Sequence, residues 1–269
     1  MKQELPKWMR MDLPMVPVLI SVLAIFLSQI PPVHVLFERA KIEVDLGTSA
    51  TILDNWGSII FQPYLILHNS GKGHGVVKSV EIEIKSMSQG SQIGVLPVQN
   101  YFQTGLVQQS NGVNIQVPLR LIRIPPESIW SNYVSAFKIP NEKKQDSINS
   151  ITVEADKIFK DEFVQGVTWE MPKNILDRAM QISLKELQKI QPGKHFVKVS
   201  AIAKSSKVLN KKFYSLTLRQ SHIDTLKKKL EFYKHGGGII FPLPTNNIYG
   251  AWVEIQPLSE TKDIRQIFN

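Results

Sequence analysis

The chain has 269 residues, of which 43% are hydrophobic, and it contains 16 Pro, 15 Gly and no Cys. This much apolar material excludes a disordered or collagen-like chain, and the lack of Cys excludes a disulfide-stapled scaffold and a cysteine-ligated zinc site. A mean hydropathy of −0.09 also excludes a protein with many membrane spans. The formal net charge is +9, so an anionic partner is one hypothesis for the basic residues.

The most apolar segment lies near the N-terminus. Residues 13–30 carry no charge, and a helix of this length would span about 27 Å, close to the hydrocarbon thickness of a bilayer. Pro31 and Pro32 would end such a helix. The pattern predicts one transmembrane helix over residues 13–32.

The charges that flank this segment predict its orientation. Lys2, Lys7 and Arg10 precede it, and no Lys or Arg follows before Arg39. By the positive-inside rule, residues 1–12 form a cytoplasmic N-terminus and the rest of the chain lies outside. No small-residue cleavage site follows the apolar run, which favours an uncleaved signal anchor. Because the chain has no N-x-S/T acceptor, we expect a single-pass protein of the bacterial cytoplasmic membrane with its C-terminal domain outside.

Beyond residue 37 the hydrophobic pattern takes the two-residue period of β-strands. Apolar and charged residues alternate in the segment 76–85, as expected for a strand with one buried face. Together with the apolar run 59–67 and the glycine-rich turn 68–75, this segment predicts a β-hairpin. Further strands are expected at 95–102, 113–124, 129–139, 238–243 and 248–255. Repeated short strands bounded by turn residues favour an antiparallel sandwich over an α/β fold.

Two helices interrupt the strand pattern. Apolar residues recur at helical spacing from Pro172 to Ile190, where Gln191-Pro192-Gly193 ends the run. A second stripe runs from Ser221 to Tyr233, and Gly236 supplies its stop. Both are predicted as accessory helices.

Four stretches carry a resemblance to a known family. Leu67–Gly71 with Val77–Ile82 looks like the junction between strands B and C of bacterial Ig-like sandwich domains. Arg123–Ser128 resembles a proline-rich turn of such domains, and Ile190–Ala201 resembles their entry to strand F. The chain is thus similar to bacterial membrane-anchored Ig-like β-sandwich proteins of unknown function. That resemblance implies a sandwich that often serves as a binding or scaffold module, and it carries no catalytic residue across.

We therefore predict a mainly β protein: an antiparallel Ig-like β-sandwich with two accessory helices, preceded by one N-terminal transmembrane helix. The extracytoplasmic sandwich is expected over residues 38–225, with a partly helical insertion at 141–190. A basic helix and a C-terminal strand pair are expected over 221–269.

The positive charge is concentrated in one segment. Residues 194–234 contain eleven basic and two acidic residues, so this segment alone carries the +9 of the whole chain. Seven lysines are the candidate contacts for an anionic partner: Lys204, Lys207, Lys211, Lys212, Lys227, Lys228 and Lys229. The partner would be anionic lipid or cell-wall polymer, while a solvated surface stays open as the simpler interpretation. Ten of the eleven basic residues are Lys, which disfavours nucleic acid as a partner because base readout relies on Arg.

No catalytic, cofactor-binding or metal-ligating motif is found, and no cofactor is predicted. The Gly71–Gly75 run lies between two predicted strands, whereas a phosphate loop needs G-x-x-x-x-G-K-[ST] before a helix. The sequence therefore favours a membrane-anchored binding or scaffold protein, an accessory subunit of a cell-envelope or membrane complex with a protein partner and the lipid bilayer. Two alternatives remain: an envelope hydrolase on glycan or peptide with a site in 141–190, and a cytoplasmic basic domain on nucleic acid or inner-leaflet lipid.

Overall fold

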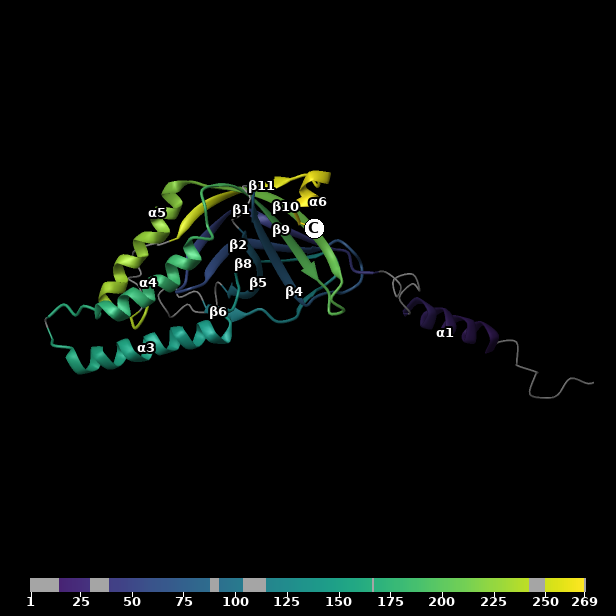
Figure 1. The fold of residues 1–269 in the computed structure, drawn as a ribbon. Coiled ribbons are helices and arrows are strands. Elements are labelled where there is room, and N and C mark those ends of the chain that lie inside the picture. Colours follow the sequence, from purple (N-terminus) through teal and green to yellow (C-terminus); the bar gives the residue numbers. More distant parts are fainter. Residues whose placement is uncertain are drawn as a thin grey trace, which may run out of the picture.

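The structure, a computed structural model, describes residues 15–29, 39–87, 92–103, 115–165, 167–241 and 250–268. Its body is a single antiparallel sheet that closes on itself (Figure 1). The eight strands of the ring, in the order in which they pair, are β4 (Ser79–Ser86), β9 (Gly193–Ile202), β10 (Val208–Leu218), β11 (Ala251–Leu258), β1 (Ile42–Asp54), β2 (Ile59–Asn69), β8 (Ser128–Phe137) and β5 (Gln92–Gln103).

Strand β5 closes the ring because it has two neighbours in different halves of its length. It pairs with β4 from Gln92 to Pro97 and with β8 from Val98 to Tyr101. The predicted Ig-like sandwich is therefore wrong, since its two sheets are here one continuous antiparallel barrel. The pattern of alternating buried and exposed residues is the same for a sandwich strand and for a barrel strand, so it could not distinguish the two.

The hairpin predicted from residues 59–67 and 76–85 is also wrong in its pairing. Strand β2 pairs with β1 and β8, whereas β4 pairs with β5 and β9. The glycine-rich segment between β2 and β4 carries the chain to a part of the ring that does not adjoin β2. On the way, the short strand β3 (Gly75–Val77) pairs with β7 (Ile122–Ile124) in a separate two-stranded sheet, and β6 (Ile115–Pro118) adds to β5.

A hydrophobic core fills the barrel and continues under the helices. Every second residue of β2 is buried from Ile59 to Asn69, and in β4 the buried residues are Val80, Ile82 and Ile84. The core cluster also takes in apolar residues of α3, α4 and α5. The strand periods read from the sequence thus identify the inward face correctly.

Helices α3 (Glu142–Glu162), α4 (Lys173–Leu187) and α5 (Gln220–Lys228) gather at one end of the barrel (Figure 1). A 3₁₀-helix, η2 (Lys229–His235), continues α5. The short helix α6 (Lys262–Phe268) lies against the barrel wall, where the rings of Phe268 and Phe213 are 5.6 Å apart. Both predicted accessory helices are present, as α4 and as α5 with η2. The long helix α3 was not expected as a helix, because only three of its residues are buried and its periodicity is weak.

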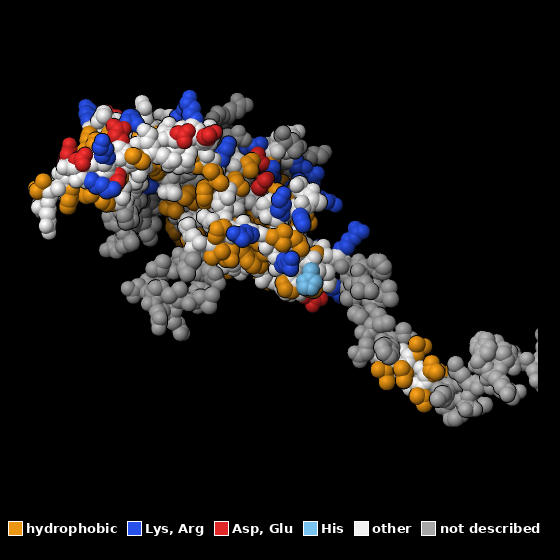
Figure 2. Space-filling view, turned by 90° about the horizontal axis from the view of Figure 1, so that it is seen from below, with side chains coloured by type: hydrophobic (Ala, Val, Ile, Leu, Met, Phe, Trp, Pro, Cys, Tyr) orange, Lys and Arg blue, Asp and Glu red, His pale blue; other side chains and the backbone are white. Residues whose placement is uncertain are grey.

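Helix α1 (Met15–Gln29) forms within the apolar N-terminal segment. Its described side chains, from Pro17 to Ile25, are exposed and mostly hydrophobic (Figure 2). In the part of the chain that the structure describes, no helix has both the length and the apolar character needed to cross a membrane.

This finding overturns two predictions. The transmembrane anchor over residues 13–32 is wrong, and so is the placement as a single-pass protein of the bacterial cytoplasmic membrane, which depended on that anchor. The flanking charges of residues 1–12 and the prolines at 31–32 lie outside the described residues.

Candidate functional site

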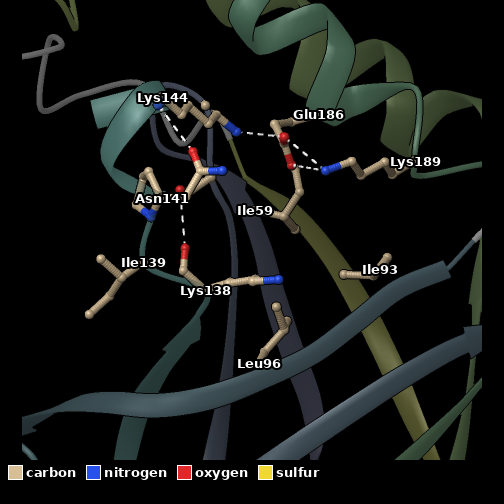
Figure 3. A pocket seen from close by; sticks show the side chains of 12 residues that line it. Ile59, Ile93, Leu96, Lys138, Ile139, Asn141, Lys144, Glu186 and Lys189 are labelled. Carbon is tan, nitrogen blue, oxygen red and sulfur yellow. Dashed lines mark hydrogen bonds and ion pairs between the residues drawn. The ribbon is translucent and has the colours of Figure 1, made fainter. Parts of the chain in front are cut away.

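A pocket of about 240 Å³ lies where one end of the barrel meets the start of α3 and the end of α4 (Figure 3). One side of its lining is apolar and includes Ile59, Ile93 and Leu96. The polar part of the lining comes from the segment that joins β8 to α3, which also contributes Ile139 and Pro140, and from the end of α4 with the residues that follow it. A pocket with one apolar and one polar wall suits a ligand that is itself amphipathic.

The edge of the pocket is set by the tight turn between β1 and β2. Asn55 and Ser58 exchange two backbone hydrogen bonds of 2.8 and 3.1 Å, while Trp56 and Gly57 have positive φ values of 29° and 85°. Two successive positive φ angles are typical of a type I′ hairpin turn, which favours glycine at its second position. A Cβ at Gly57 would lie 2.7 Å from Cγ2 of Ile182 on α4, so only glycine allows this close approach.

The first turn of α3 lies at the polar wall. Asn141 is the N-cap, and its side-chain Oδ1 accepts a 3.0 Å hydrogen bond from the backbone N–H of Lys144. The positive end of a 21-residue helix therefore adjoins the pocket, which favours negative charge there.

Glu186 projects from the last turn of α4 between two lysines. Its Oε1 lies 2.5 Å from Nζ of Lys144 and its Oε2 lies 2.7 Å from Nζ of Lys189 (Figure 3). Burial alone would raise the pKa of Glu186, but hydrogen bonds from the two ammonium groups outweigh it and hold the pKa below its ordinary value. Glu186 is thus held in its ionised form and is poorly suited to act as a proton donor.

A third lysine, Lys138, completes the polar wall. Its side chain extends toward the middle of the pocket (Figure 3). Among the described residues of the lining there are three lysines and one carboxylate, so the pocket carries a net charge of +2. In those same ranges no group of three His, Asp or Glu is arranged to hold a metal ion. The net positive charge of the lining favours a negatively charged group there.

A buried polar cluster lies behind the β1–β2 turn. Asp54 is the last residue of β1, and Nζ of Lys229 donates a hydrogen bond to its backbone oxygen. Nearby, the hydroxyls of Tyr233 and Ser183 are 2.8 Å apart. Burial raises the pKa of Asp54 and of Tyr233 and lowers that of Lys229. None of these side chains lines the pocket, so the cluster supports the turn rather than contacting a ligand.

The seven lysines predicted as contacts for an anionic partner do not form one surface. Lys204 and Lys207 are exposed in the turn between β9 and β10, while Lys227 and Lys228 are exposed on α5. Strand β10 separates these two pairs, and its eleven residues span about 35 Å.

The other three predicted lysines have acidic partners within the protein. Nζ of Lys211 lies 3.0 Å from Glu260, and Nζ of Lys212 lies 2.5 Å from Asp45. Lys229 is buried against Asp54. On the face shown in Figure 2, basic side chains are interspersed with acidic ones rather than gathered in a block.

The pocket residues themselves were not singled out from the sequence. Asn141, Lys144, Glu186 and Lys189 all belong to the segment 141–190 that the sequence marks as an insertion, but they lie at its two ends. One local signal exists: Pro140, Asn141 and Glu142 form a typical helix start, with an N-cap followed by an acidic first turn. The meeting of this start with the end of α4 is a product of the tertiary fold.

Comparison with known proteins adds little. No family model matches the chain, and no curated protein matches it. Among solved structures, the crystal structure of a selenomethionine-labelled beta-glucosidase from Kluyveromyces marxianus is similar at a TM-score of 0.26 and 10% sequence identity. The similarity covers 67% of this chain and 14% of that chain, and at this level it carries no argument about fold or function.

Proposed function

We propose that the protein is a binding module that takes a small amphipathic anion, such as a medium-chain carboxylate, in the lysine-lined pocket. The observation that carries this proposal is the excess of three ammonium groups over one carboxylate beside an apolar wall. The carboxylate of the ligand would lie against Lys138, Lys144 and Lys189. Its hydrocarbon part would lie against Ile59, Ile93 and Leu96.

The charge on the polar wall supports an anion rather than a neutral ligand. Glu186 already pairs with the ammonium groups of Lys144 and Lys189, while Lys138 brings a further ammonium group to the same pocket. The first turn of α3 adds the partial positive charge of a helix N-terminus. A negative group entering here replaces water by charge-assisted hydrogen bonds, which are the stronger kind.

The size of the pocket supports a small ligand. Its volume of about 240 Å³ is below the range of about 300–1,000 Å³ that drug-sized molecules occupy. A single short alkyl chain fits this space better than a polymer does.

Binding is favoured over hydrolysis by the state of Glu186. General acid–base catalysis needs a group whose pKa lies near the operating pH. Glu186, the one carboxylate among the described lining residues, is instead held ionised by two ammonium groups.

Calorimetric titration of the full chain with octanoate tests the proposal. We expect saturable binding that weakens with added salt, because the contact is ionic and partly exposed. Octylamine, which has the same chain and the opposite charge, should not bind. Lys138→Met should weaken octanoate binding at least tenfold, since a hydrogen bond to a charged group contributes about 1.5–3 kcal/mol.

Two further variants make the test specific. Lys143→Met removes a lysine from the same turn of α3 that does not line the pocket, so octanoate affinity should be unchanged. Glu186→Gln removes the negative charge from the pocket and should raise the affinity. Equal binding of octanoate and octylamine, or equal losses in the Lys138 and Lys143 variants, would refute the proposal.

A further inference from the structure

A second hollow, of about 450 Å³, lies on the outside of the barrel where β10 and β11 meet the first turn of α5. Along β11, Ala251, Val253 and Ile255 are buried, so the residues between them face outward. Trp252 is one of these and is 62% exposed, far more than the buried Trp56. An indole ring left so open on a barrel wall is an available flat apolar surface.

Polar side chains from three strands line the rest of the hollow. Glu254 and Gln256 follow Trp252 on the outward face of β11. Ser215 of β10 is paired with Gln256, and Thr217 of β10 is paired with Lys194 of β9. Of these, Glu254 and Thr217 lie nearer to the indole, whereas Gln256 is four residues, about 13 Å, further along β11 and Ser215 is buried. The hollow offers both donors and acceptors of hydrogen bonds.

Positive charge enters the hollow from two directions. Lys194 lies at the start of β9, and Arg219 lies between the end of β10 and the start of α5. Arg219 is exposed, and its guanidinium is suited to bidentate hydrogen bonding with a carboxylate. The backbone N–H of Arg219 donates to Nδ1 of His222, which fixes the loop that carries it.

From this arrangement we propose that the hollow is a saccharide-binding site, selective for a sugar that carries a carboxylate, such as a uronic acid. The C–H face of a pyranose ring packs on Trp252, and its hydroxyls bond to Glu254 and Thr217, while Gln256 is placed to contact the next sugar unit of an oligosaccharide. The carboxylate of the sugar lies against Arg219 and Lys194. This site shares no lining residue with the pocket proposed to bind an amphipathic anion and does not depend on it.

A nucleotide is the competing ligand, because a base can stack on Trp252 and a phosphate can meet Arg219. Glu254 favours the sugar. Its carboxylate accepts hydrogen bonds from the hydroxyls that a pyranose presents around its ring, whereas the face and edge of a stacked base offer fewer such donors.

Calorimetric titration of the full chain with tetragalacturonate, cellotetraose and AMP, each in a separate experiment, tests this inference. Tetragalacturonate should bind at least tenfold more tightly than either of the other two. Trp252→Ala should reduce that affinity at least tenfold, and Trp252→Phe should restore part of it. Arg219→Gln should remove the preference for tetragalacturonate over cellotetraose while leaving the weaker binding of cellotetraose in place.

Tyr133→Ala is the matched control, since Tyr133 is a comparably exposed aromatic residue (52%) on β8 that does not line the hollow. It should bind tetragalacturonate like the unaltered chain, and so should Lys138→Met, which separates this site from the other pocket. The inference is overturned if tetragalacturonate does not bind, if AMP binds more tightly, or if the Tyr133 and Trp252 variants lose affinity equally.

Discussion

The ammonium of Lys229 lies 3.9 Å from Oδ2 of Asp54, and both side chains are almost completely buried. Lys229 belongs to the helical segment after β10, whereas Asp54 is the last residue of β1, 175 positions earlier. The contact therefore fixes the η2 segment to the end of the barrel. Removing one member leaves the other without its counter-charge in a site closed to water, which is costly.

Lys229→Met is expected to lower the free energy of unfolding by about 3–5 kcal/mol, the range found when a buried pair loses one partner. Urea unfolding at neutral pH measures this. The control is Lys228→Met, because Lys228 precedes it on the exposed face of α5 and should change stability by less than about 0.5 kcal/mol. The double variant with Asp54→Asn should lose less than the sum of the two single variants. Equal effects of the Lys228 and Lys229 substitutions would contradict the role given to the buried pair.

Glu186 predicts a dependence of stability on pH. Its pKa in the folded chain is below the ordinary value of 4.5, so the unfolded chain binds a proton more readily at this site. The stabilisation is therefore complete above about pH 4.5 and is lost as the pH falls through the folded-state pKa. Glu186→Gln should cost about 1.5–3 kcal/mol at pH 7, and this difference should shrink toward zero in acid.

Urea unfolding of both chains in steps between pH 7 and pH 3 follows this change. Glu162→Gln serves as the control, because Glu162 is exposed at the end of α3. Its difference from the unaltered chain should stay small at every pH. A Glu186→Gln difference that is constant with pH would show that the ion pairs with Lys144 and Lys189 do not stabilise the fold.

Asn69 holds the glycine-rich turn that leaves β2. The side chain is fully buried and makes five hydrogen bonds to the backbone. Its Oδ1 accepts from the N–H groups of Lys41 and Gly71, and its Nδ2 donates to the carbonyls of Gly73, Ile124 and Pro125. Asn69→Ala leaves these groups without partners, so we expect a loss of about 3 kcal/mol or more.

Thermal unfolding, checked with urea, measures this loss. Ser70→Ala provides the comparison, since Ser70 is the exposed neighbour and its hydroxyl bonds are on the surface. That substitution should cost less than about 1 kcal/mol. A similar shift for both variants would mean that the buried amide of Asn69 is not what holds the turn.

The sequence predicts local structure here better than it predicts pairing. The alternation of Val80, Ile82 and Ile84 with charged residues marks the buried face of β4, and the apolar stripe after Lys173 marks α4. Which strands are neighbours depends on contacts such as Pro97 with Glu81 and Ala136 with Val98, which no periodicity encodes. A closed barrel and a two-sheet sandwich therefore produce the same alternation of apolar and polar residues in the sequence.

The candidate site could not be predicted from the sequence for the same reason, because its residues are brought together by the tertiary fold. Lys138, Lys144 and Lys189 look like ordinary surface lysines in the sequence, and they meet only because α3 and α4 close over the same end of the barrel. Conversely, Lys211 and Lys212 belong to a segment rich in positive charge, yet Glu260 and Asp45 from distant segments pair with them. Counting charge along the chain cannot anticipate such pairing.

The pairing of β1 with β11 has a consequence for how the chain is made. About 200 residues separate these neighbours, so at about 5–20 residues per second a ribosome needs on the order of 10–40 s to supply the second after the first. Throughout that interval the emerging chain presents the unpaired edge of β1, and once residue 218 has been made it also presents that of β10. The ring can therefore close only after the last strand has been made, and until residue 258 has left the ribosome these edges are open to pairing with other chains.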